Sequence, residues 1–302
     1  MKGGSPVARL GDRERRIGRS RRSLEALLDG IFRPGGWAAE LARRTGLQGN
    51  VQTTSTTVAI GSRATGAEPL RIGFASDFHA GATTHPSLLE RACDAIAGLG
   101  ADVVLFGGDF VTMRASSMRE LTPLLASIHA PCGKFAVLGN HDLRADSNKI
   151  VAALGRAGVT LLSNRHTRLP APFDDVSICG LDDPTVGEPR ADLALDGVRG
   201  TRIVLMHAPE GLRAIADRHF DLALCGHTHG GQIALPSGRP LLVGGGQLNR
   251  RYAAGWHAVD GNAARTILVS RGVGCSTLPF RMFADPEVHL IVVTGARDGC
   301  GP

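Results

Sequence analysis

Apolar and polar positions follow two different patterns along the chain. Continuous apolar runs predict buried strands at residues 70–76, 102–106, 134–138, 202–206 and 222–225, with further short strands at 159–162, 176–181, 266–270 and 288–294. Apolar residues at helical spacing predict helices between these runs, at residues 86–99, 117–129, 147–157 and 209–218. Strands that alternate with helices predict a layered α/β domain with its helices on the outside.

The N-terminal part of the chain does not show this alternation of strands and helices. Apolar residues at helical spacing predict two short helices there, over residues 23–32 and 37–47. Residues 48–69 are rich in Thr, Gly and Ser, which is typical of a linker or of an edge strand. We therefore expect a basic N-terminal extension with a linker over residues 1–69 and one folded domain over residues 70–302.

All of the excess positive charge lies in the N-terminal extension. The formal net charge is +6; residues 1–47 carry 11 Lys/Arg and 5 Asp/Glu, and residues 48–302 carry 23 of each. The body of the protein therefore gives no reason to expect a nucleic-acid partner. A basic segment with an apolar helical face is typical of an interfacial membrane anchor, but a helix packed on the body beside a solvated basic tail would have the same composition.

The same segment bears on the location of the protein. No stretch approaches the roughly 18 uncharged apolar residues that a transmembrane helix needs. Ser20-Arg21-Arg22-Ser23-Leu24 resembles a twin-arginine signal, but charged residues such as Glu25 and Asp29 follow where an export signal requires an apolar region. We expect a cytoplasmic protein and no export by a twin-arginine route; the first of the two alternatives for residues 1–47 would add peripheral contact with the inner membrane.

Side chains that can bind metal follow the ends of five predicted strands. They stand in Asp77-Phe78-His79, Gly108-Asp109, Gly139-Asn140-His141-Asp142, His207 and Gly226-His227-Thr228-His229. In an extended segment the side chains at i and i+2 point the same way, so His227 and His229 should face one common point, as should Asp77 and His79. Each residue alone could equally serve a turn or the core. Together, at the strand ends where α/β sheets hold ligands, they predict one site.

The residue types of this set favour a particular chemistry. His, Asp and Asn supply nitrogen and oxygen ligands, which suit Mn, Fe or Zn better than Mg or Ca. One carboxylate can bridge two ions through its two oxygens. Two divalent ions would leave the site net positive even beside two aspartates and a hydroxide, so the site would attract a phosphate. The set therefore predicts two adjoining metal ions acting on a phosphate ester.

In their order along the chain, the five segments resemble the calcineurin-like metallophosphoesterase superfamily, over roughly residues 70–294. The resemblance implies a catalytic domain built as a four-layer αββα sandwich, with two mixed β-sheets flanked by helices. It implies one metal ion held by Asp77, His79, Asp109 and His229. It implies a second metal ion held by Asp109, Asn140, His207 and His227.

The resemblance also implies how such a site works. A metal-bridging hydroxide would attack phosphorus in line. His141 would contact the scissile phosphate or protonate the leaving oxygen without binding metal, and Asp142 would orient His141. Arg271 and Arg281 could meet a second phosphate of the substrate or form surface salt bridges.

A narrower likeness concerns the C-terminal half. Residues 226–233, Val269-Ser270-Arg271-Gly272 and Pro286-Glu287 resemble bacterial membrane-associated or exported phosphodiesterases and enzymes that cleave the pyrophosphate of UDP-2,3-diacylglucosamine. This likeness implies hydrolysis of a phosphodiester or pyrophosphate bond, with a lipid-linked substrate among the candidates. A phosphomonoesterase, a nucleotide phosphodiesterase and a non-catalytic scaffold on the same fold remain open as alternatives. A scaffold would be expected to lack some ligands, and this chain has all of them.

Overall fold

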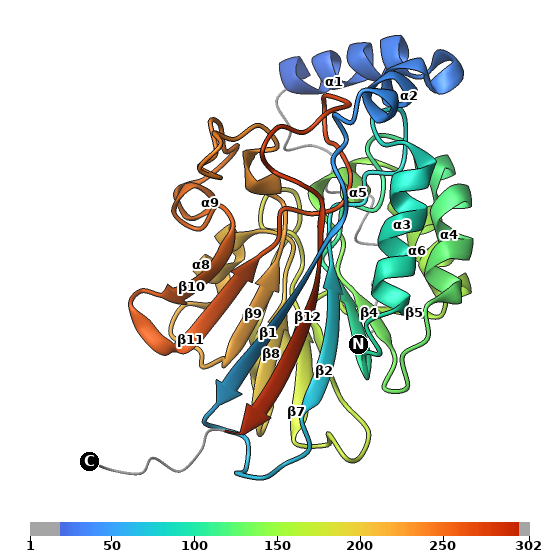
Figure 1. Cartoon of the computed structure of the whole chain (residues 1–302). Coiled ribbons are helices and arrows are strands. Elements are labelled where there is room, and N and C mark those ends of the chain that lie inside the picture. Colours follow the sequence, from blue (N-terminus) through green and yellow to red (C-terminus); the bar gives the residue numbers. More distant parts are fainter. Residues whose placement is uncertain (1–18, 296–302) are drawn as a thin grey trace, which may run out of the picture.

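The computed structural model describes residues 19–295, and residues 1–18 and 296–302 lie outside the described part. Its strands form two six-stranded sheets, shown in Figure 1. The first has the order β1 (Gln52–Ile60), β12 (Glu287–Gly295), β2 (Leu70–Ala75), β3 (Val103–Phe106), β4 (Lys134–Ala136) and β5 (Val159–Leu161). The second has the order β10 (Gly255–Val259), β11 (Asn262–Val269), β9 (Leu222–Cys225), β8 (Thr201–Leu205), β7 (Val176–Gly180) and β6 (Arg165–Arg168).

Both sheets are mixed, as predicted. In the first sheet β12 runs antiparallel to β2, while the pairs from β2 to β5 are parallel. In the second sheet β7, β8, β9 and β11 are parallel, and the edge strands β6 and β10 are antiparallel to their neighbours. The carboxyl ends of β2, β3 and β4 therefore lie at the same end of the first sheet, and those of β8 and β9 lie at the same end of the second.

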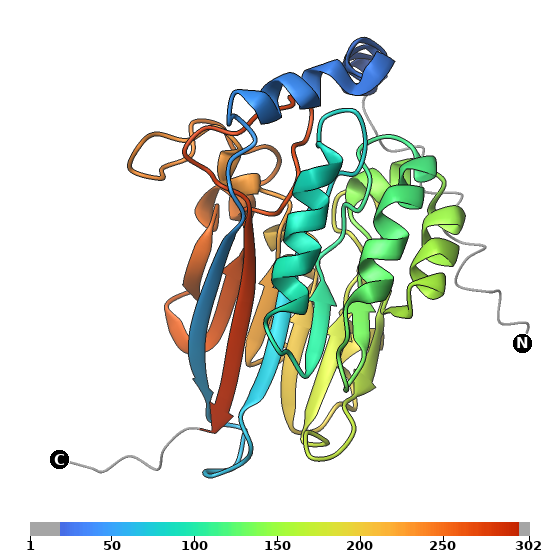
Figure 2. The same ribbon diagram turned by 45° about the vertical axis from the view of Figure 1, so that its right-hand side comes forward.

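Helices cover the outer face of each sheet. Figure 2 shows the helices that cover the first sheet: α3 (Pro86–Ala97), α4 (Met118–Ser127) and α6 (Ser147–Arg156). The second sheet packs against shorter elements: α7 (Ala191–Leu195), the 3-10 turn η5 (Pro209–Gly211), α8 (Leu212–Ile215) and α9 (Gln247–Arg251). Further short elements are α5 (Asn140–Arg144) and the 3-10 turns η3 (Pro34–Gly36), η4 (Ala115–Ser117) and η6 (His229–Gly231).

Alternation along the strands divides the core into layers. Ile203 and Leu205 of β8 join an apolar cluster between the two sheets, whereas Val204 joins the cluster under the outer helices. Strand β3 does the same from the other side, with Leu105 between the sheets and Phe106 beneath helices. Because these strands are buried on both faces, their sequences are continuously apolar. The predicted four-layer αββα sandwich is confirmed.

The N-terminal part of the described chain lies against the same end of the sandwich as the strand ends. Helices α1 (Arg19–Phe32) and α2 (Trp37–Arg44) cross that end at the top of Figure 1. Strand β1 pairs with β12 at the edge of the first sheet. Of the two alternatives for residues 48–69, a linker or an edge strand, residues 52–60 are therefore the edge strand. The domain division at residue 69 stays a prediction. Within residues 19–295, each helix is too short or too polar to cross a bilayer.

Two elements lack the sequence patterns that predict secondary structure, and one predicted helix is shorter than expected. Strand β6 has the sequence Arg-His-Thr-Arg and is largely exposed, so no apolar run marks it. Helix α5 lies within the predicted metal-binding segment, and its five residues are too few to show a period. The helix expected over residues 209–218 is instead the turn η5 followed by the single turn α8.

Candidate metal centre

The predicted site residues converge from both sheets. Asp77, Asp109 and Asn140 follow β2, β3 and β4, and His207 and Gly226 follow β8 and β9. The following predicted site residues are at most 6% exposed: His79, His141, His207, His229, Asp77, Asp109 and Asp142. So many buried polar groups are costly unless they are paired with one another or with a cation.

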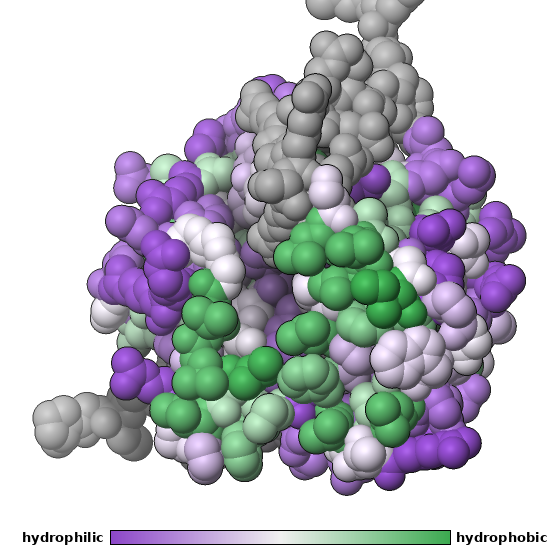
Figure 3. Space-filling model, turned by 90° about the horizontal axis from the view of Figure 1, so that it is seen from above, coloured by the Kyte–Doolittle hydropathy of each residue, from purple (hydrophilic) through white to green (hydrophobic). Residues whose placement is uncertain are grey.

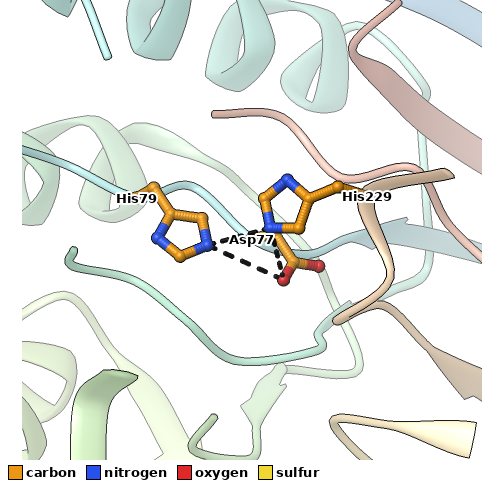
Figure 4. A group of neighbouring side chains, drawn as sticks. All are labelled: Asp77, His79 and His229. Atoms are coloured by element: carbon orange, nitrogen blue, oxygen red, sulfur yellow. Dashed lines mark hydrogen bonds and ion pairs between the residues drawn. The ribbon is translucent and has the colours of Figure 1, made fainter. Parts of the chain in front are cut away.

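One group of three side chains meets around Asp77. Nε2 of His79 and Nε2 of His229 face each other at 3.0 Å. Oδ1 of Asp77 lies 3.4 Å from Nε2 of His229 and 4.0 Å from Nε2 of His79. Figure 4 shows the two imidazoles and the carboxylate pointing toward one another. Three possible ligand atoms thus surround one point and could hold a metal ion.

A second group meets around His207. Its Nε2 lies 3.2 Å from Oδ2 of Asp109, 3.1 Å from Nδ1 of His227 and 3.3 Å from Oδ1 of Asn140. Hydrogen bonding alone would favour the opposite amide orientation of Asn140, in which its nitrogen donates to Nδ1 of His227 at 2.9 Å. An amide oxygen turned toward two imidazole nitrogens is instead what a bound cation requires.

Asp109 stands between the two groups. Its Oδ2 is 3.2 Å from Nε2 of His207 in the second group and 3.6 Å from Nε2 of His79 in the first. Its Oδ1 accepts a hydrogen bond from the backbone N–H of His141 at 2.8 Å, which fixes the carboxylate. One carboxylate is therefore close enough to serve both groups.

The electrostatics of the cluster suit a cation. Burial, with His229 nearby, lowers the pKa of His79 well below its usual value, and burial with His207 nearby lowers the pKa of His227 to about 3. Burial opposes charge on Asp109 and His207 as well, but each holds the other ionised: the pKa of Asp109 lies well below its usual value and that of His207 well above. Neutral imidazoles and ionised carboxylates are the donor forms that bind metal, and a cation would replace the proton on His207.

The backbone at the site adopts a conformation that sequence spacing did not suggest. Five of the predicted ligands have positive φ angles: Asp77 (56°), His79 (45°), Asp109 (54°), His227 (70°) and His229 (54°). Such angles are uncommon outside glycine and cluster at functional sites. The extended geometry expected for His227 and His229 is wrong, because His227 belongs with Asp109 and His229 with Asp77.

His141 and Asp142 do not contact each other in the expected way. Nδ1 of His141 donates to the carbonyl of Thr112 at 2.6 Å, so this carbonyl orients the ring. The carboxylate of Asp142 accepts backbone N–H groups instead, from Phe110 (2.9 Å), Val111 (3.2 Å) and Gly139 (3.1 Å). Burial and the charge of Asp109 raise the pKa of Asp142 to about 8, while the N–H groups of Gly139 and Val111 act in the opposite direction. Asp142 therefore joins the two loops that carry Asp109 and His141.

The sequence did not show which groups lie behind the ligands. Nδ1 of His207 donates to the carbonyl of Gly107 at 2.8 Å, which leaves Nε2 to face the cluster. Arg281 is 3% exposed, and its Nη2 lies 3.1 Å from Nδ1 of His229. A surface salt bridge is therefore the wrong expectation for Arg281. Backbone carbonyls and distant arginines leave no local signal, because only the fold brings them to the ligands.

The sequence of residues 70–231 matches the calcineurin-like phosphoesterase family. The chain belongs to this family. It is 33% identical over 230 residues to phosphodiesterase YaeI of Escherichia coli K12, covering 74% of this chain and 82% of that protein. It is 31% identical over 198 residues to the metallophosphoesterase YkuE of Bacillus subtilis 168, covering 64% and 68%.

A relative from an animal matches as well. It is a transmembrane protein with a metallophosphoesterase domain from Danio rerio, 28% identical over 242 residues, covering 75% of this chain and 54% of that protein. Family membership confirms the prediction of a metal-dependent phosphoric ester hydrolase. The family uses divalent metal ions, and the Asp and His groups described above are able to hold them.

Proposed function

We propose that this protein is a two-metal phosphodiesterase that hydrolyses a phosphodiester or pyrophosphate bond. The observation that carries the proposal is the pair of donor groups that share Asp109, whose Oδ2 lies 3.2 Å from His207 and 3.6 Å from His79. A site for one metal ion would need only one of these groups. Two groups joined by a carboxylate fit two adjoining divalent ions.

The proposed ligands divide between the two ions. Asp77, His79, Asp109 and His229 would hold one. Asp109, Asn140, His207 and His227 would hold the other. Mn, Fe and Zn are the metals that this nitrogen and oxygen set suits best. When bound, two such ions supply a nucleophile at neutral pH and positive charge for an in-line displacement at phosphorus.

His141 would act on the substrate itself. Nδ1 of His141 donates to the carbonyl of Thr112, so Nε2 of His141 does not take part in that bond. A ring nitrogen of His141 lies within 4.8 Å of the possible ligand atoms of His79 and Asp109. From there His141 would stabilise the scissile phosphate or protonate the leaving oxygen. Asp142 would be a positioning residue, since it acts through the backbone of the two loops that it joins.

The proposal also includes a lipid-linked substrate. It includes peripheral contact of residues 1–47 with the cytoplasmic side of the inner membrane. Residues 1–18 of that segment lie outside the described residues. Its described part supports the proposal, because Leu24 and Leu27 of α1 are 53% and 61% exposed. The name of the relative YaeI, a phosphodiesterase, favours a diester over a monoester.

The test is elemental analysis of the purified full chain, followed by hydrolysis assays with a panel of substrates. The panel contains bis-p-nitrophenyl phosphate, p-nitrophenyl phosphate, cyclic nucleotides and a UDP-linked lipid. We expect two metal ions per chain and a preference for the diester or the lipid pyrophosphate. A single ion per chain at full activity would contradict the two-metal proposal, and a preference for the monoester or for cyclic nucleotides would favour the alternative phosphoesterases.

A further inference from the structure

Helix α1 lies on the body with its polar side inward. Glu25 and Asp29 are each 6% exposed, whereas Leu24 and Leu27 project into solvent. The carboxylate of Glu25 lies 3.5 Å from Nη1 of Arg144, which belongs to the helix that carries His141. A helix that simply packs on a globular body buries its apolar stripe. In α1 ion pairs hold the acidic side down, so the apolar side faces outward.

A second exposed apolar area lies in two loops that follow His229. Its members are Leu235, Leu241, Leu242, Met282 and Phe283, which we call the loop anchor; Leu242 is 82% exposed and Phe283 57%. The two loops are joined to each other. Nε2 of Gln232 donates to the carbonyls of Leu278 and Phe280, both at 2.9 Å, and the N–H of Met282 donates to the carbonyl of Gln232 at 3.0 Å.

Both apolar areas belong to the face on which the metal centre lies. Figure 3 shows hydrophobic side chains in two areas of this face, separated by a hollow with hydrophilic residues in it. A small cavity on this side is lined by Glu25 of α1, by His141 and by Thr277 of the second loop. The N-terminal segment is also tied to that loop, since the N–H of Arg281 donates to the carbonyl of Leu47 at 2.7 Å.

The charges around these areas indicate what they contact. Residues 232–246 contain Arg239 and no Asp or Glu, whereas the second loop contains the buried Arg281 and the exposed Asp285. By sequence, the whole segment 1–47 carries 11 Lys/Arg and five Asp/Glu, and two of those acids, Glu25 and Asp29, face inward. The loop anchor is therefore apolar, and the N-terminal segment that crosses the same face has a net positive charge by sequence. Exposed apolar side chains beside a positively charged segment are typical of a surface that binds an anionic bilayer. A fluid bilayer has no fixed shape, so apolar side chains on both sides of a hollow can insert into it at the same time.

We infer that the loop anchor is a second membrane-docking element, which together with α1 and α2 seats the metal centre on an anionic bilayer. It deepens the proposed function, since it places the hollow opposite the headgroup phosphates of lipids. The docking itself requires no catalysis. Failure of docking and failure of hydrolysis can therefore be told apart.

The test is co-sedimentation of the full chain with vesicles of phosphatidylcholine alone and with 30% phosphatidylglycerol, at low and high salt. Leu241→Glu/Leu242→Glu removes the loop anchor at its most exposed point, and Phe283→Glu perturbs its other loop. Leu193→Glu is the matched control, because Leu193 is 55% exposed in α7, which packs on β6 and β7. Hydrolysis of bis-p-nitrophenyl phosphate is measured on each protein in parallel.

We expect the unaltered chain to bind the anionic vesicles more tightly than the neutral ones, and less tightly at high salt. The double variant should bind at least about tenfold more weakly, because two exposed leucines that would insert into the bilayer are replaced by charges. Phe283→Glu should also weaken binding, and Leu193→Glu should not. Unchanged binding by both loop variants would overturn the inference while leaving anchoring by α1 intact. An equal loss of vesicle binding by Leu193→Glu would also overturn it. So would the finding that the full chain is a dimer and that the double variant dissociates it, because the loop anchor would then be buried between two copies.

Discussion

Replacement of Gly226 by alanine should disable the metal centre while leaving the fold in place. Gly226 stands where β9 ends and its backbone approaches the carboxylate of Asp77. A Cβ at this position would lie 2.0 Å from Oδ2 of Asp77 and 2.2 Å from Oγ of Ser76. Real Cβ atoms essentially never come within 3.0 Å of such neighbours, so the carboxylate and the strand end must separate by about 1 Å or more.

The consequences of that shift follow from the contacts of Asp77. Its Oδ2 accepts the backbone N–H of His227 at 3.0 Å, and its Oδ1 lies 3.4 Å from His229, so both histidines would be disturbed. A displacement of about 1 Å at a reacting site costs on the order of 10²-fold in rate. Overpacking of a filled site costs about 1–3 kcal/mol of stability. Gly226→Ala should therefore lose most metal and about 10²-fold or more of the hydrolysis rate, with a cooperative unfolding transition at a lower Tm.

The assays are elemental analysis, hydrolysis of bis-p-nitrophenyl phosphate and thermal unfolding. Gly155→Ala is the matched control, because Gly155 lies in α6 with an ordinary backbone angle, and a methyl group added there would have open space for 4 Å around it. That control should keep its metal and rate, and gain about 0.5–1 kcal/mol of stability as a glycine removed from a helix. Full metal content and full rate in Gly226→Ala would refute the reasoning that this glycine admits Asp77 to the site.

Three further predictions concern the same centre. Asp109→Asn should lose metal and at least about 10²-fold in rate with its fold retained by circular dichroism, since even residues that only support ligands are worth about 10–100-fold; two ions at full activity would show that Asp109 does not bridge. His141→Ala should lower the rate by about 10²–10⁴-fold at unchanged metal content, with a smaller loss for better leaving groups; metal lost together with rate would make His141 a ligand. EDTA should abolish hydrolysis and lower the Tm, and Mn²⁺ should restore both, because a cation at 100 times its Kd that binds only the folded state stabilises it by about 2.7 kcal/mol; a Tm that does not respond to metal would contradict the centre.

Much of the architecture could be predicted from local pattern. The strands that lie between layers, such as β3 and β8, are continuously apolar because both of their faces are buried, and their sequences show it. The long helices α3, α4 and α6 show a helical period because each buries one side. Strand β6 shows neither pattern, since it is an exposed edge held by hydrogen bonds to β7 that place no demand on its side chains.

The identities of the clustered site residues could also be read from the sequence, because donors such as Asp77 and His207 follow strand ends. Local pattern did not give their arrangement, which only the resemblance to a known family implied. Positive φ angles at Asp77, His79, Asp109, His227 and His229 replace the extended geometry that spacing implied. Contacts across the fold, such as Asp109 between two groups, depend on how the two sheets pack and not on neighbours in the chain.

Helix α1 shows the division most clearly. Its sequence determined an amphipathic helix, with apolar residues on one side and Glu25 and Asp29 on the other. Which side faces the body was decided by Arg144 and Arg114, which are distant in sequence and pair with those acids at 3.5 Å and 3.4 Å. Local pattern determines which surfaces a segment has, because periodicity is a property of neighbouring residues. Only the tertiary structure decides what each surface meets, because ion pairs and close approaches join residues that the chain itself keeps far apart.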